Sequence, residues 1–171
     1  KRESIRQRLK QLESREALTR EDYDQLRIWA ADSASEIRTL IVGFLAQRTE
    51  QSAGELLLTL IRDSDPAVRA YALDVLCNFP GEECSERLRQ AAETEPDAAA
   101  RFCAIRSLAD GMAETEPSEA LAYVQALFRR ETEELCRLGC CYGRYLYGDH
   151  RALNDILRQL AANRAELRAN A

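Results

Sequence analysis

The chain has 171 residues, of which 46% are hydrophobic and 31% are charged, so its composition is globular rather than disordered. With 7 Gly and 4 Pro it is too poor in turn residues for a loop-rich all-β fold, and no apolar run approaches the 18 residues of a membrane span. The net charge of −5 argues against duplex nucleic acid as the main ligand, because binding phosphates needs a basic surface.

The first 20 residues differ from the rest in charge. They carry a net +4, whereas the remainder carries −9. We interpret residues 1–19 as a solvated, basic leading helix with apolar residues at Ile5, Leu9 and Leu12. The alternative is that this basic start lies next to a membrane anchor that precedes Lys1, since no initiator Met is present.

The following segments alternate between amphipathic stretches and short turns. Helix starts are expected at Thr19 or Arg20 and, with Ser33 or Ser35 as N-cap, at Glu36. The middle of the chain predicts helices over 53–62, 67–78, 84–92 and 97–111, with Pro66 in the first turn of the second of these. The last part predicts helices over 118–130, 131–147 and 150–162, with Asp149 as an N-cap, and residues 163–171 either continue as helix or fray.

An acidic residue precedes an arginine by six positions four times, each time where one predicted helix turns into the next. The arginines are 31, 32 and 36 residues apart, which is the length of one helical hairpin. We predict that these residues bridge adjacent hairpins through part-buried, charge-assisted hydrogen bonds. The four pairs are Asp32/Arg38, Asp63/Arg69, Glu95/Arg101 and Glu131/Arg137.

The segment from Asp63 to Arg69, followed by Ala72, Leu73, Val75 and Leu76, resembles the turn-and-arginine motif of the short bacterial HEAT repeats. The resemblance covers roughly residues 20–147 and weakens in the fourth unit. It implies an all-α fold, a right-handed α-α superhelix of about five hairpins, in a single domain. Within that domain we expect a leading helix (1–19), four hairpins (20–147) and a terminal capping helix or helices (149–171).

The same resemblance implies a scaffold that binds a peptide or protein on its concave, second-helix face. In register, the outward positions of the second helices form a mixed apolar and charged stripe, the kind of surface that peptide grooves use. The alternative is that small side chains occupy this face only because it is crowded. The candidate binding residues are Leu40, Tyr71, Asp74, Cys103, Arg106 and Tyr142.

The sequence gives little support for a catalytic or metal-binding site. Cys136 and Cys140 lie four apart on one helical face, yet they occupy the register positions of Ile37 and Ala72, so we interpret them as core residues. His150 is read as a first-turn surface residue, and no catalytic or phosphate-binding motif occurs. We expect no metal, no cofactor and free cysteines in a reducing compartment.

Gly139 and Gly143 fall inside one predicted helix, where each costs about 1 kcal/mol relative to Ala. Close helix packing is the preferred explanation, and a partner's backbone is the alternative. The functional prediction is a non-enzymatic interaction module of a bacterial cytoplasm, since the repeat is short and Arg outnumbers Lys by 22 to 2. The alternatives are a base-excision or chromophore-lyase enzyme on the same scaffold, and a membrane-tethered assembly factor.

Overall fold

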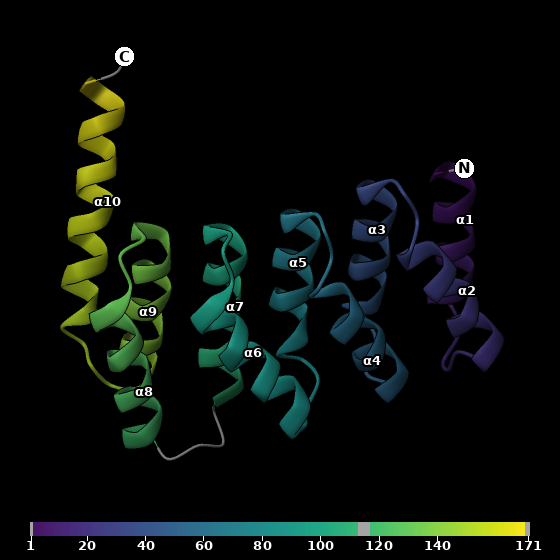
Figure 1. Cartoon of the computed structure of the whole chain (residues 1–171), viewed down its shortest axis with the longest axis horizontal. Coiled ribbons are helices and arrows are strands. Elements are labelled where there is room, and N and C mark those ends of the chain that lie inside the picture. Colours follow the sequence, from purple (N-terminus) through teal and green to yellow (C-terminus); the bar gives the residue numbers. More distant parts are fainter. Residues whose placement is uncertain (1, 113–116, 170–171) are drawn as a thin grey trace.

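The computed structural model describes residues 2–112 and 117–169, with side chains to residue 161, and these ranges contain ten α-helices and no strand (Figure 1). The predicted all-α solenoid of helical hairpins is thereby confirmed. The helices are α1 (Arg2–Glu13), α2 (Arg20–Ala30), α3 (Ser35–Leu45), α4 (Gln51–Leu60), α5 (Pro66–Leu76), α6 (Glu82–Thr94), α7 (Ala98–Gly111), α8 (Pro117–Arg130), α9 (Glu134–Leu146) and α10 (Ala152–Ala169).

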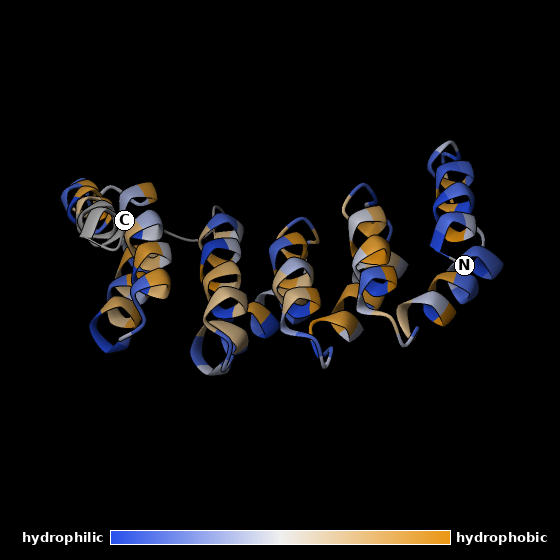
Figure 2. Ribbon diagram, turned by 90° about the horizontal axis from the view of Figure 1, so that it is seen from above, coloured by the Kyte–Doolittle hydropathy of each residue, from blue (hydrophilic) through white to orange (hydrophobic). Residues whose placement is uncertain are grey.

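Four hairpins follow one another in a row: α2/α3, α4/α5, α6/α7 and α8/α9. The second helices α3, α5, α7 and α9 pack side by side, and the row is extended by α1 beside α3 and by α10 beside α9 (Figure 1). The first helices α2, α4 and α6 form a second layer with sparser mutual contacts. Seen from above, the two termini lie at opposite ends of an open array (Figure 2).

The register of the repeat decides which residues are buried between the layers. The residue before each arginine is at most 4% exposed in all four units, and the residue three positions after each arginine is fully buried. One continuous cluster of buried residues runs from Ile5 on α1 to Cys140 on α9. The positions in question are Ile37, Val68, Ala100 and Cys136, and then Ile41, Ala72, Ala104 and Cys140.

Local signals fix several helix starts. Thr19 and Asp22 form a reciprocal capping box at the start of α2, which satisfies two backbone N–H groups. Asp65 caps α5 by accepting from the Ala67 N–H, and Pro66 occupies the first turn as predicted. Asp97 caps α7 through the Ala100 N–H.

Some predicted boundaries are wrong. The N-cap of α3 is Ala34, not Ser33 or Ser35, because the Asp32 carboxylate accepts the Ala34 N–H and thereby shapes the turn. The fourth second helix begins at Glu134 rather than at 131, because the Glu131 carboxylate holds the N–H groups of Thr132 and Glu133 in a turn. The last helix begins at Ala152 rather than at 150. It runs without interruption to Ala169, so that residues 163–169 are helical, which was one of the two alternatives for this segment.

Candidate interaction surface

All four arginines bind the turn of their own hairpin through its main chain. Nη1 of each arginine donates to the carbonyl oxygen of the acidic residue six positions earlier, at 2.7 Å for Arg38, 2.9 Å for Arg69 and 2.5 Å for Arg101. The acidic partner within each sequence pair is therefore bonded through its backbone, and its carboxylate is available to a different arginine.

That carboxylate binds the arginine of the preceding hairpin. Nε and Nη2 of Arg38 donate to the two oxygens of Asp63 at 2.6 and 2.7 Å. Arg69 Nη2 reaches Glu95 at 2.8 Å, and Arg101 Nε reaches Glu131 at 3.0 Å. We call these three contacts the ladder. Each arginine thus ties the turn of its own unit to the turn of the next.

The turns hold the carboxylates of the ladder in place. Asp63, Glu95 and Glu131 each also accept the backbone N–H two residues further on, at 2.8, 3.1 and 2.8 Å. All three carboxylates are at most 12% exposed, so the ion pairs are shielded from solvent. Such partly buried, two-point arginine–carboxylate contacts are stronger and more directional than surface ion pairs.

The ladder shifts the acidity of its members. The hydrogen bonds with Asp63, Glu95 and Glu131 raise the pKa of Arg38, Arg69 and Arg101, respectively. Burial by itself disfavours the charged carboxylate of Asp63, but the bonds from Arg38 and the Asp65 N–H outweigh it and lower the pKa of Asp63. The pKa of Glu131 is lowered in the same way, against burial, by Arg101 and two N–H groups.

The fourth arginine, Arg137, ends the ladder. Its Nη1 donates to the Glu131 carbonyl at 3.0 Å, as the register predicts, and also to the Phe128 carbonyl at 3.1 Å. Its guanidinium carbon lies 4.0 Å from the centre of the Phe128 ring. Asp32 is the first acidic residue of the series. Its carboxylate accepts a hydrogen bond from the Ala34 N–H, and its carbonyl oxygen accepts one from Arg38.

The six residues predicted to bind a partner all lie on second helices, but they differ in availability. Leu40 and Cys103 are half-buried against the core. Asp74 on α5 forms an ion pair with Arg106 on α7, and the Tyr142 hydroxyl donates to Asp110 at 2.6 Å. These polar groups join neighbouring second helices, so part of the predicted stripe holds the array together.

A hollow of about 680 Å³ opens on this face between α1 and α3. Leu9, Leu40 and Phe44 supply apolar lining, while α1 adds charged side chains of both signs, Arg6 and Lys10 together with Glu3 and Glu13. Tyr71 reaches the hollow from α5 across Gly43, where a Cβ would lie only 3.2 Å from the tyrosine hydroxyl oxygen. The glycine thus leaves room for the ring.

Sequence reasoning missed the contribution of α1 to this hollow. It placed the site on the second helices alone and treated residues 1–19 as a separate leading helix. The sequence did contain a signal for this contribution. Because the helix buries Ile5, Leu9 and Leu12, it carries Arg6 and Lys10 on the adjacent side of the helix. That α1 lies beside α3 follows only from tertiary packing.

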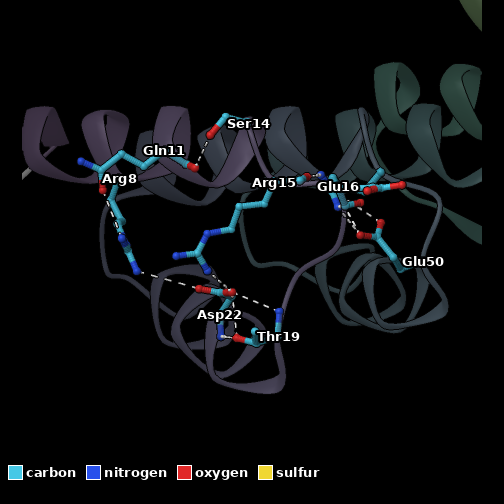
Figure 3. Close-up of polar contacts among 9 residues, drawn as sticks. Arg8, Gln11, Ser14, Arg15, Glu16, Thr19, Asp22 and Glu50 are labelled. Carbon is cyan, nitrogen blue, oxygen red and sulfur yellow. Dashed lines mark hydrogen bonds and ion pairs between the residues drawn. The ribbon is translucent and has the colours of Figure 1, made fainter.

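A second polar network, also missed, joins the segment between α1 and α2 to Asp22 of α2, and Arg8 of α1 lies 3.9 Å from the same carboxylate (Figure 3). Asp22 is 6% exposed and accepts hydrogen bonds from Arg15 at 2.7 Å, from the Thr19 hydroxyl at 2.8 Å and from the Thr19 N–H at 3.0 Å. The Thr19 bond is the main cause that lowers the pKa of Asp22. Arg48 adds a further tie by donating to the Arg15 carbonyl while pairing with Glu50.

The two interior glycines of α9 are explained by close packing. A Cβ on Gly139 would lie 3.1 Å from the Phe102 ring on α7, and one on Gly143 would lie 3.0 Å from Val124 Cγ1 and 3.1 Å from the Ala109 Cβ. Because both glycines are buried, a partner's backbone is not needed to account for them.

The cysteines and the histidine considered as catalytic or metal-binding candidates do not form a common site in the described part of the chain. Burial raises the pKa of the Cys136 thiol to about 11 and that of Cys140 to about 12, as expected for core thiols. His150 is exposed, with its ring edge-on to Tyr145 at 5.5 Å. Within residues 2–112 and 117–161, no three His, Cys, Asp or Glu side chains are arranged to hold a metal ion.

None of the helices described is both long and apolar enough to cross a bilayer. Neither a curated protein nor a solved structure matches this sequence. The family model for HEAT repeats matches residues 53–143, more than half of the chain and the region that contains the last two contacts of the ladder. With the hairpin array and the repeated turn contacts, this match shows that the chain belongs to the HEAT-repeat family.

Proposed function

We propose that the protein is a non-catalytic scaffold that binds a peptide or protein partner on its second-helix face, in the hollow between α1 and α3. HEAT repeats commonly serve as protein-interaction scaffolds, which supports the general role. The observation that carries the proposal is the hollow itself, with its apolar floor of Leu9, Leu40 and Phe44 beside charged groups of α1.

The dimensions and chemistry of the hollow suit a peptide side chain. Its volume falls within the range of about 300–1,000 Å³ that is usual for ligand sites. Tyr71 is 36% exposed, and an exposed tyrosine beside an apolar floor offers both contact area and a hydrogen-bonding group. The paired groups Asp74/Arg106 and Tyr142/Asp110 then act as a polar border further along the face.

The expectations of a bacterial source and a cytoplasmic location belong to this proposal. They rest on the short repeat and the excess of Arg over Lys. Membrane tethering and an enzymatic role draw no specific support from the arrangement of the side chains described above.

The test is peptide selection against the full chain, followed by affinity measurements on variants. Peptides that bind the hollow should lose at least about tenfold in affinity with Tyr71→Ala or Leu40→Glu, equivalent to about 1.4 kcal/mol. Tyr145→Ala and Ile28→Ala remove exposed apolar groups elsewhere and should leave binding unchanged. Selected peptides that are insensitive to Tyr71→Ala and Leu40→Glu would refute the assignment.

A further inference from the structure

Arg137 stands in the register of the three arginines of the ladder and makes the same bond to its own turn. The Nη1 contact to the carbonyl six residues earlier is 3.0 Å, against 2.5–2.9 Å in the other three units. In those units, the remaining donors Nε and Nη2 hold the carboxylate of the following turn. Arg137 therefore makes the contact to its own turn (the inner half of the site) that, in the other three units, accompanies binding of a carboxylate by Nε and Nη2 (the outer half).

No carboxylate of the described residues occupies the outer half of this site. Among the residues described, the acceptors bonded to Arg137 are the carbonyls of Glu131 and Phe128, both through Nη1. The contact to Phe128 takes the place of the second turn carbonyl that Arg38, Arg69 and Arg101 use. Nε and Nη2 are thus left with no acceptor from this part of the chain.

The surroundings leave the arginine accessible and hold it in position. Arg137 lines a hollow of about 330 Å³ between α9 and α10, together with Phe128, Glu134 and Arg158. The Phe128 ring lies against the guanidinium at 4.0 Å, which restrains its plane. The other carboxylate of the hollow, Asp155, is occupied by Arg144 at 3.1 Å and lies 3.6 Å from Arg158.

We propose that Arg137 binds the carboxylate of an Asp or Glu side chain in a turn of a partner protein, which extends the ladder by one contact. A carboxylate fits because three sites of the same design in this chain all hold one, and because the planar guanidinium matches it at two points. A phosphate dianion is a poorer fit than a carboxylate, since Glu134 in the lining repels two negative charges more strongly than one. This site lies apart from the hollow between α1 and α3, and it rests on the proposed function only in taking its ligand from a protein.

The probe is a capped peptide with the sequence of residues 61–67, which contains Asp63 in the turn that the ladder already recognises. The readout is the Nε–Hε resonance of Arg137 in the ¹⁵N-labelled full chain. We expect a saturable shift with this peptide. The Asp63→Asn peptide should bind at least about tenfold more weakly, because it cannot accept a charge-assisted two-point contact.

Protein variants separate the site from general charge effects. Arg137→Gln should abolish the effect of the peptide on neighbouring amide resonances, and Arg137→Lys should retain only part of it, because lysine keeps the charge but not the fork. Arg129→Gln removes an exposed arginine of α8 and should change nothing. Equal binding of the Asn peptide, or unchanged binding to Arg137→Gln, would overturn the proposal.

Two further measurements test whether the carboxylate must belong to a peptide, and distinguish the Arg137 site from the hollow between α1 and α3. Acetate at the same concentration and ionic strength should shift the resonance far less than the peptide, and an equal saturable shift would instead assign the site to small free carboxylates. Tyr71→Ala should leave the peptide's effect on Arg137 intact. Loss of that effect would place the peptide in the hollow between α1 and α3 and refute the Arg137 site. Binding at Arg137 alone would support this site, and the proposed binding of a peptide in the hollow between α1 and α3 would still be decided by the affinity measurements on Tyr71→Ala and Leu40→Glu.

Discussion

Arg38 and Asp63 are 25 residues apart in the sequence and face each other through two hydrogen bonds of 2.6 and 2.7 Å. Both side chains are at most 10% exposed. The same arginine also holds the Asp32 carbonyl of its own turn at 2.7 Å. One side chain therefore fixes the position of two successive hairpins, and the pattern recurs at Arg69 and Arg101.

Loss of a ladder arginine should destabilise the array. Arg69→Ala removes the contacts to Glu95 and to the Asp63 carbonyl and leaves a partly buried carboxylate behind. We expect the free energy of unfolding to fall by about 1–3 kcal/mol, the usual cost of leaving such a group unpaired. Denaturant unfolding of the full chain measures this. Arg62→Ala, which truncates an exposed arginine nearby, is the control, and equal effects of the two variants would contradict the structural role of Arg69.

The ladder should also make stability depend on acid pH. The pKa of Asp63 is lower in the folded protein than its ordinary value of 3.8. Its contribution to the free energy of unfolding is therefore complete above about pH 4–5 and is lost as the pH falls through the folded-state pKa. Asp63→Asn should lower stability at neutral pH and flatten its decline below pH 4.

The matched control for this prediction is Asp24→Asn. Asp24 is exposed and pairs with Arg27, three residues further along the same helix. Unfolding curves between pH 2 and pH 7 should show the same acid slope for this variant as for the parent protein. A parallel slope for Asp63→Asn as well would mean that other carboxylates carry the acid dependence.

The glycine at position 143 should resist substitution. In Gly143→Ala the new methyl group would lie 3.0 Å from Val124 and 3.1 Å from Ala109, so α7, α8 and α9 would have to shift. Overpacking of this kind costs about 1–3 kcal/mol, which exceeds the gain of up to about 1 kcal/mol from better helix propensity. We expect a lower free energy of unfolding, measured by denaturant titration.

Gly111→Ala provides the comparison. Apart from the local backbone, no atom of the described residues lies within 4 Å of the position that a Cβ would take at Gly111. Only the propensity term therefore remains, and stability should rise by up to about 1 kcal/mol. If both substitutions stabilised the protein, the close approach of α9 to α7 and α8 would be wrong.

The sequence by itself determined the helical hairpins and their register. Apolar spacing, the capping groups Thr19 and Asp65 and the recurrence of Asp63/Arg69 act over a few residues, so they can be recognised without knowing the fold. The buried positions of Val68, Ala72 and Cys140 follow from the same periodicity.

The tertiary structure alone decided which residues of neighbouring helices contact one another. Whether an arginine bonds to the carboxylate six residues before it or to one 25 to 30 residues after it depends on how two hairpins stack, and the sequence pattern is the same in both cases. The hollow between α1 and α3, the pairing of Asp74 with Arg106 and the position of Arg137 against Phe128 likewise arise from distances between helices. Local periodicity fixes the face that a residue occupies, whereas packing of the neighbouring helices fixes its partner.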